Sequence, residues 1–239
     1  MEGPVARVTV GTGARGNALP TEGWRRIAAT FDELSARDEL RAVLVSGDGA
    51  SFCAGSDMTE WRDASLEFVN DSFRAMESAF RAIERCPVPV VAEIRGAAAG
   101  AGCQLALACD LRVMALSGRI GMPVARLGIR VSPAFAARID RTAGNAVATE
   151  LLVGGQLFDA SRALATGLVN EVAADDELAA ATAQLVNAIV ALPPPAARAA
   201  KQAIVAARPQ PPEPTGDAVD YEVFRVAVAS FLDRASQAR

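Results

Sequence analysis

The stretch GAAAGAGCQLALACD, from Gly96 to Asp110, places small residues directly ahead of an apolar helical run. Small residues let the main chain approach a ligand closely, and the first amides of a helix have no partner within the helix. The helix dipole favours negative charge at the same place. The spacing therefore predicts backbone N–H groups near Cys103 and Gln104 that point toward a bound group.

The chain contains no histidine, which restricts acid–base chemistry at neutral pH. Proton transfer is left to carboxylates, to a tuned Lys or Tyr, or to a group of the substrate, and histidine-dependent triads are excluded. The four cysteines, Cys53, Cys86, Cys103 and Cys109, lie in apolar contexts without zinc-type pairing. We expect buried reduced thiols and no metal site. For Cys103, at a helix start, a lowered thiol pKa is the alternative to a small buried thiol.

The segment GTGARG, Gly11 to Gly16, follows a predicted strand and has the spacing of a dinucleotide-binding loop. That mechanism requires a helix that begins at the glycines. Pro20 intervenes, and the helix is predicted to start at Thr21. No acidic residue closes a second strand about 20 residues onward. We therefore interpret GTGARG as a turn-rich loop.

Strands and helices alternate through the first part of the chain. Apolar runs predict strands at residues 5–10, 41–47, 87–96 and 110–116. Helical spacing predicts helices at 21–34, 66–85, 101–108 and 135–152. This order indicates an α/β fold in which loops at strand ends carry the site.

Strand patterns disappear after residue 175. A helical run over 175–192 ends at three prolines, residues 208–217 form a spacer, and a last helix is predicted over 218–235. We divide the chain into a core, 1–175, and a helical C-terminal oligomerisation or lid segment, 176–239. The apolar faces of the C-terminal segment predict packing on another subunit or back over the core.

The chain of 239 residues is 51% hydrophobic and 22% charged, with a formal net charge of −4. It is long enough to bury its own core. No basic patch for nucleic acid and no polybasic membrane anchor is present, and no apolar run reaches membrane-spanning length. We expect a cytoplasmic protein whose partners are small molecules or sister subunits, not nucleic acid or a membrane.

Two segments together resemble the enoyl-CoA hydratase/isomerase, or crotonase, superfamily. They are SFCAGSDM, Ser51 to Met58, and RGAAAGAGCQLALACD, Arg95 to Asp110, each of which follows a predicted strand. The resemblance extends to RGNAL at 15–19, to LGI at 127–129 and to the A..A...GLVNEV pattern at 160–172. It implies a crotonase-like ββα spiral with a helical C-terminal segment, assembled as a homotrimer or a dimer of trimers.

The resemblance also implies site residues. In the superfamily, one backbone amide after the first loop and one in the glycine-rich loop hold a thioester oxygen, and by position these are the amides of Ser56 and Ala101. Gly100 is the neighbouring candidate for the second donor, and tight packing of a helix on the sheet is the structural alternative for the small residues. The implied contacts to coenzyme A come from Arg15, Ala18, Ala54, Asp57 and Met58. No cofactor is implied beyond the coenzyme A of the substrate.

The resemblance breaks down at the acid–base positions. The two glutamates of a hydratase would stand at residues 104 and 124, where this chain has Gln104 and Val124, and the acid of isomerases and dehalogenases would stand at Ser132. None of these three residues exchanges a proton at neutral pH. Gln104 is left either to orient water or a substrate carbonyl or to bond nearby backbone, and Ser132 either to donate a hydrogen bond or to cap the following helix. Glu60, Asp63, Arg126, Arg130 and Asp140 are the remaining ionisable candidates, without an assigned role.

We therefore expect an enzyme that stabilises a thioester enolate and performs isomerisation, decarboxylation or hydrolysis rather than hydration. The first alternative is a protein that binds acyl-CoA without turnover. The second is a subunit that only assists assembly of an active homologue.

Overall fold

The computed structural model describes residues 3–237 and has a five-stranded, all-parallel main sheet in the order β1-β2-β3-β5-β8. Its strands are β1 (Val5–Val10), β2 (Ala42–Gly47), β3 (Val90–Ile94), β5 (Leu111–Ala115) and β8 (Glu171–Ala173). The central strands are apolar on both faces, because both faces of a parallel sheet are covered. Val43 and Val45 face one core, and Ala42 and Leu44 face the other.

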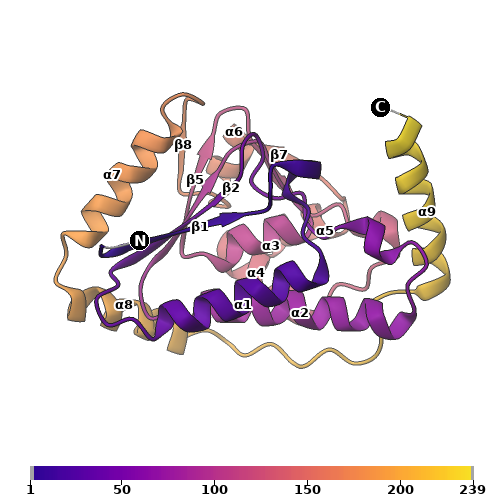
Figure 1. Ribbon diagram of the computed structural model, residues 1–239, viewed down its shortest axis with the longest axis horizontal. Helices are drawn as coiled ribbons and strands as arrows, with labels where there is room; N and C mark the ends of the chain where they lie inside the picture. Colours follow the sequence, from indigo (N-terminus) through magenta and orange to yellow (C-terminus); the bar gives the residue numbers. More distant parts are fainter. Residues whose placement is uncertain (1–2, 238–239) are drawn as a thin grey trace.

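Helices cover the two faces of this sheet unequally (Figure 1). The larger core lies against α1 (Thr21–Ser35), α2 (Leu66–Arg85), α3 (Ala101–Ala108) and α4 (Pro133–Ala143). On the other face α7 (Leu178–Val190) buries Leu178 and Val186 against β2, β3 and β5. Two short helices, α5 (Asn145–Leu152) and α6 (Ala160–Ala165), lie between α4 and α7 in the sequence.

A second, three-stranded sheet was not predicted. It joins β4 (Ala97–Ala99), β6 (Arg119–Gly121) and β7 (Leu157–Asp159), with β4 and β6 parallel and β6 and β7 antiparallel. Three short 3₁₀ helices, η1 (Ala14–Asn17), η2 (Met58–Trp61) and η3 (Ala125–Leu127), lie in the loops. Because β4 runs directly into α3, this small sheet fixes where α3 begins.

Most predicted helix starts are confirmed. The dinucleotide-like loop forms a turn and η1, and α1 begins at Thr21 as predicted. The prediction of one helix over 135–152 is wrong, because Gly144 has a φ of 84° and separates α4 from α5. A chain in that left-handed region cannot continue an α-helix.

The C-terminal segment folds back over its own chain. The sequence patterns missed α8 (Pro194–Ala206), in which Lys201 is the one buried residue. The last helix, α9 (Tyr221–Gln237), begins three residues later than predicted, because the preceding residues pair with the segment after η3. The Arg130 amide donates to the Ala218 carbonyl at 2.8 Å, and the Asp220 amide donates to the Gly128 carbonyl at 2.9 Å. The helix itself contacts η2 and η3.

Two cations hold α8 in place. The Arg198 guanidinium donates to the carbonyl oxygens of Asp38 and Leu40, just beyond the end of α1. The Lys201 ammonium donates to the Val88 carbonyl at 2.8 Å and pairs with Asp110 at 2.6 Å. Polar contacts therefore replace the apolar face that most helices bury.

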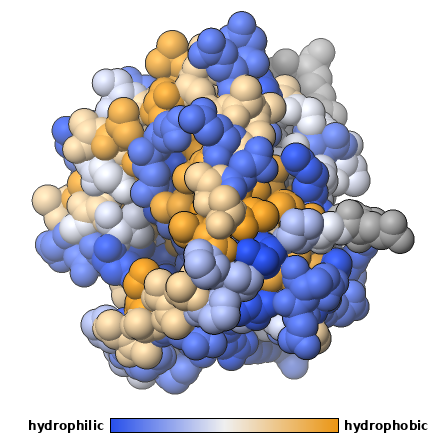
Figure 2. Space-filling model, turned by 90° about the vertical axis from the view of Figure 1, so that its left-hand side faces the viewer, coloured by the Kyte–Doolittle hydropathy of each residue, from blue (hydrophilic) through white to orange (hydrophobic). Residues whose placement is uncertain are grey.

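Apolar side chains gather at the centre of the face that carries α7 and α8, within a ring of hydrophilic residues (Figure 2). Leu192, after α7, and Ile204, on α8, are among the exposed large apolar side chains. No single helix within residues 3–237 is long and apolar enough to cross a membrane; α7 and α8 pass that test only as a pair, with a bend of 104° between them.

Candidate functional site

The two loops that resemble the superfamily, at 51–58 and 95–101, are hydrogen-bonded to each other. After β2, the Cys53 amide donates to the Ala97 carbonyl at 2.9 Å, and the Ala99 amide donates to the Cys53 carbonyl at 3.0 Å. A Cβ built on Gly55 would lie 2.9 Å from the Ala99 carbonyl oxygen and 3.2 Å from the Ala101 nitrogen. The loop that carries Ser56 therefore lies directly against the start of α3.

The main-chain amides of Ser56 and Ala101 are the two donors that the resemblance assigns to the site. Within residues 3–237 neither N–H has a hydrogen-bond acceptor. The neighbouring candidate, the Gly100 amide, donates to the Gly121 carbonyl at 2.9 Å. Ala101 is the first residue of α3, so its amide has no partner inside the helix and lies at the favourable end of the dipole. Of the two candidate donors in the second loop, Ala101 is the one that remains unengaged.

The Ser56 side chain contacts two residues of the core. Its Oγ accepts a hydrogen bond from Trp24 Nε1 at 3.2 Å and lies 3.0 Å from the Met76 sulfur. Trp24 packs edge-on against Phe80 at 5.4 Å between ring centroids. Neither Trp24 nor Met76 was singled out from the sequence, because their spacing matches ordinary core positions of α1 and α2.

The five residues expected near coenzyme A come together. The Ala54 amide donates to the Gly16 carbonyl at 2.8 Å, which places the loop of Arg15 and Ala18 beside the loop of Ala54, Asp57 and Met58. Arg15 pairs with Asp57 at 2.7 Å and donates to Thr59 Oγ1 at 3.0 Å.

Asp57 caps η2 by accepting from the Thr59 amide. Burial opposes its ionisation, but the Thr59 hydrogen bonds and the Arg15 charge outweigh burial and hold the pKa of Asp57 below its usual value. Asp57 therefore stays ionised at neutral pH, and the positive charge of Arg15 is already matched within the loop.

Gln104 lies one turn along α3 from Ala101 and is completely buried. Its Nε2 donates to the Phe135 carbonyl at 3.2 Å and lies 3.0 Å from the Met122 sulfur. Its Oε1 accepts from Arg138 at 2.8 Å. Every polar atom of the Gln104 side chain therefore has a protein partner.

Arg138, which the sequence patterns did not single out, is 1% exposed. It pairs with Glu84 at 2.8 Å and with Glu77 at 3.2 Å, and it lies 5.1 Å from the Phe80 ring centroid. A buried cation is tolerated where carboxylates pair with it. This network ties α2, α3 and α4 together behind the amide loops.

The other acid–base positions carry no proton-transfer group. Val124 is buried, and a Cβ built on Gly100 would lie 4.0 Å from its side chain, so an apolar group borders the second loop. Ser132 caps α4 by accepting from the Phe135 amide at 3.2 Å. Glu60 accepts from the amide and hydroxyl of Thr21 at 2.7 and 2.9 Å and so caps α1.

Of the remaining candidates, Asp63, Arg126, Arg130 and Asp140 have exposed side chains. Arg130 pairs with Asp220 at 3.8 Å. The structure therefore leaves these side chains in solvent.

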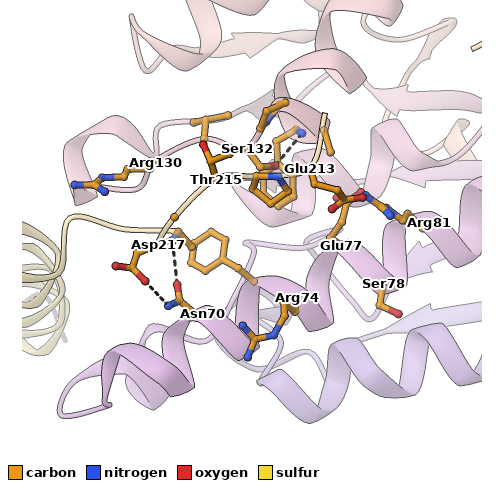
Figure 3. A pocket seen from close by; sticks show the side chains of 18 of the residues that line it. Asn70, Arg74, Glu77, Ser78, Arg81, Arg130, Ser132, Glu213, Thr215 and Asp217 are labelled. Carbon is orange, nitrogen blue, oxygen red and sulfur yellow. Dashed lines mark hydrogen bonds and ion pairs between the residues drawn. The ribbon is translucent and has the colours of Figure 1, made fainter. Parts of the chain in front are cut away.

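A cavity of about 960 Å³ opens between α2, the loop at 130–135 and the spacer at 213–218 (Figure 3). Ser132 lines it, but no residue of the two amide loops does. Several of its charges are paired: Arg81 contacts Glu77 and Glu213, Arg74 contacts Asp71, and Arg130 contacts Asp220. Arg85 also lines the cavity.

All four cysteines are buried and reduced. Burial raises the pKa of Cys53, Cys103 and Cys109 to about 12 in each case. The alternative of a lowered pKa at Cys103 is wrong, because desolvation by burial outweighs the lowering by the Arg112 charge and by the backbone of Gly121. No cluster of metal-ligating side chains is found within the described residues, 3–237.

Comparisons with known proteins show the family to which the chain belongs. The family model described as Enoyl-CoA hydratase/isomerase matches residues 1–232. A protein of Mycobacterium bovis named probable enoyl-CoA hydratase EchA17 is 37% identical over 188 residues, which cover 79% of this chain and 72% of the relative. The short-chain-enoyl-CoA hydratase of Clostridium acetobutylicum is 33% identical over 206 residues, 85% of this chain and 78% of the relative.

Solved structures give the same result. An enoyl-CoA hydratase/carnithine racemase from Magnetospirillum magneticum aligns with a TM-score of 0.83 and 33% identity, covering 100% of this chain and 91% of that one. An enoyl-CoA hydratase/isomerase family protein from Hyphomonas neptunium aligns with a TM-score of 0.84 and 26% identity, covering 98% and 93%. The family model, the sequence relatives and the fold together place the chain in the enoyl-CoA hydratase/isomerase, or crotonase, family.

Proposed function

We propose that the protein binds an acyl-CoA thioester with its carbonyl oxygen on the amides of Ser56 and Ala101, and that it stabilises the enolate formed there. The observation that carries this proposal is the pair of adjacent, unengaged amides, one on each loop, while the Gly100 amide is engaged. Removing one such donor typically lowers a rate by ~10²- to 10³-fold. No cofactor is needed beyond the coenzyme A of the substrate.

The reaction is one that needs little acid–base help from the protein. Hydration, the activity named for the relatives, requires groups that deliver water and a proton, and this chain has Gln104 and Val124 at the two expected positions. The side-chain amide of Gln104, which is hydrogen-bonded to Phe135 and Arg138, supports the same conclusion. Isomerisation, decarboxylation and hydrolysis therefore fit better than hydration.

Decarboxylation is the least demanding of these reactions. When the bond from the α-carbon to a carboxylate breaks, carbon dioxide leaves and the electron pair passes onto the thioester oxygen. The two amides stabilise that oxyanion, and water later protonates the α-carbon. No protein base takes part in the bond-breaking step.

The second candidate is a protein that binds acyl-CoA without converting it. The contacts that occupy every polar atom of Gln104, and the apolar side chain of Val124 beside the second loop, favour this reading. The third candidate, a subunit that assists assembly, predicts negligible affinity for CoA and co-purification of an active homologue. As the active form we propose a cytoplasmic homotrimer or dimer of trimers, which light scattering of the purified protein tests.

Calorimetry paired with product analysis separates these readings. The panel contains crotonyl-CoA, 3-enoyl-CoA and malonyl-type CoA thioesters together with free CoA. Conversion of a 3-enoyl or malonyl-type thioester, without hydration of crotonyl-CoA, supports the leading proposal. Tight binding without conversion selects the binding protein. Rapid hydration of crotonyl-CoA overturns the interpretation of Gln104 and Val124.

A glycine pair tests the amide site itself. Gly55→Ala places a methyl group 2.9 Å from the Ala99 carbonyl oxygen and should separate the two loops, which weakens thioester binding. Gly144→Ala is the matched control, because Gly144 also has a positive φ, 84° against 102°, but a Cβ there meets nothing within 4 Å and the residue lies outside both loops. Equal losses of thioester affinity in both variants would show that the effect is backbone strain alone.

A further inference from the structure

Asn17 is a buried polar residue that the sequence patterns left without a role. It is 1% exposed and adopts a φ of 61°. Its Nδ2 donates to the Ser51 carbonyl at 2.7 Å and to the Asp48 carbonyl at 2.9 Å. Its Oδ1 accepts from the Gly13 amide at 2.8 Å. One side chain therefore joins the N-terminal loop to the segment that leads into the first amide loop.

The chemistry of this position requires an amide side chain. The carbonyl oxygens of Asp48 and Ser51 need a donor, while the Gly13 amide needs an acceptor, and only Asn or Gln supplies both. Asn also tolerates the left-handed backbone better than most residues. The Asn17 side chain packs directly against the main chain of Gly11, where an added Cβ would lie 2.3 Å from Asn17 Oδ1.

Residues 17–19 hold the first amide loop on both flanks of Ser56. Upstream, the Asn17 side chain holds the Ser51 carbonyl. Directly before Ser56, the Gly55 carbonyl accepts from the Leu19 amide at 2.8 Å. Directly after it, the Asp57 amide donates to the Leu19 carbonyl at 2.8 Å. The Ser56 amide lies between these contacts and stays unengaged.

We propose that Asn17 is a positioning residue, which sets the direction of the Ser56 amide by fixing the segment at 48–52. The inference rests on the proposed function, because it assigns Asn17 to the geometry of the same thioester site. A donor held in advance at the oxyanion costs no reorganisation when charge develops. Loss of the Asn17 contacts therefore weakens the hydrogen bond to the thioester oxygen and leaves contacts to the rest of CoA in place.

The test uses cinnamoyl-CoA, whose conjugated thioester absorbs at longer wavelength when its carbonyl is polarised. Wild-type protein should shift this absorption on binding. Asn17→Asp keeps the shape but places carboxylate oxygens against two carbonyls. We expect it to lose most of the spectral shift and to bind cinnamoyl-CoA roughly 10-fold more weakly, while affinity for free CoA changes less than about threefold.

Two further variants keep the outcome decisive. Asn17→Gly retains the left-handed backbone without the carboxylate and should also lose the shift, so it replaces Asn17→Asp if that variant does not fold. Thr182→Val removes a buried hydroxyl that donates to the Leu178 carbonyl on α7, across the main sheet, and should lower thermal stability without changing the shift.

The outcomes separate the two proposals. If wild-type protein neither binds cinnamoyl-CoA nor shifts its absorption, the proposed function is wrong and the role of Asn17 is overturned with it. If wild-type protein shifts the absorption and both Asn17 variants shift it equally, losing only thermal stability as Thr182→Val does, the positioning role is overturned and the proposed function stands.

Discussion

Replacement of Arg138 by methionine should be the most destabilising single substitution in the network behind the amide loops. Arg138 is buried and pairs with Glu84 at 2.8 Å and Glu77 at 3.2 Å, and it donates to Gln104 Oε1 at 2.8 Å. Methionine fills much of the same volume but offers no donor to these three acceptors. The substitution therefore leaves two partly buried carboxylates and one buried amide short of a partner.

The magnitude follows from these contacts. Removing one partner of a buried ion pair costs about 3–5 kcal/mol, and an orphaned buried acceptor costs about 1–3 kcal/mol. Glu84 retains Arg141 and Glu77 retains Arg81, which reduces the first cost. We expect a loss of about 4 kcal/mol in the free energy of unfolding, and for a domain of this size about 2–4 °C in Tm per kcal/mol, hence a fall of roughly 8–16 °C.

Urea titration followed by circular dichroism measures this loss directly. Arg162→Met is the matched control, because Arg162 pairs with Glu150 at 2.9 Å with both side chains largely exposed. An exposed pair contributes about 0–1 kcal/mol. If Arg138→Met costs no more than Arg162→Met, the buried network contributes little, and the reasoning from burial and pairing fails.

Three further results are expected. The double variant Gln104→Glu with Val124→Glu should gain the ability to hydrate crotonyl-CoA, measured as loss of the enoyl thioester absorbance. Each single variant should remain unable to hydrate it. Hydration by the wild-type protein would contradict this prediction. Glu60→Ala should cost about 1 kcal/mol in urea unfolding, because it removes the carboxylate that caps α1, and an unchanged midpoint would show that the cap contributes nothing. Burial opposes ionisation of Glu84, but the charges and hydrogen bonds of Arg138 and Arg141 outweigh burial and lower the pKa of Glu84. A pKa that is lower in the folded state than in the unfolded state stabilises the fold fully above the unfolded pKa of about 4.3. This stabilisation is lost as pH falls through the folded pKa. The free energy of unfolding should therefore fall less steeply with decreasing pH in Glu84→Gln than in wild type.

Much of the fold could be predicted because its signals are local. Strands buried on both faces appear as continuous apolar runs, so β1 and β2 were found within a residue of their bounds. The Leu66–Arg85 helix follows a serine that caps it, and its apolar spacing continues to its end. Signals of this kind need no knowledge of distant parts of the chain.

The missed elements depend on partners far along the chain or are too short to show a period. The strands β4, β6 and β7 have three residues each, which is too few for alternation to appear. Gly144 interrupts a run whose apolar spacing continues on both sides, so the break is visible only in the backbone angle. The start of α9 is set by pairing with the segment after η3, more than eighty residues earlier.

The candidate site divides in the same way. The two loops were recognisable because small residues at fixed spacing are needed for close approach of the main chain. The polar groups around those loops, Asn17, Glu60 and Arg138, have partners more than 30 residues away. An isolated polar residue gives no sign in the sequence of which distant backbone it will meet.

The buried thiols offer a way to measure local opening of the two loops. Cys53 belongs to the first loop and Cys103 lies in the first turn of α3, and both side chains are fully buried. A thiol of this kind reacts with a reagent in solution only when its surroundings open. The labelling rate of each cysteine therefore reports how often its own loop opens. A thioester bound to both loops should lower both labelling rates together.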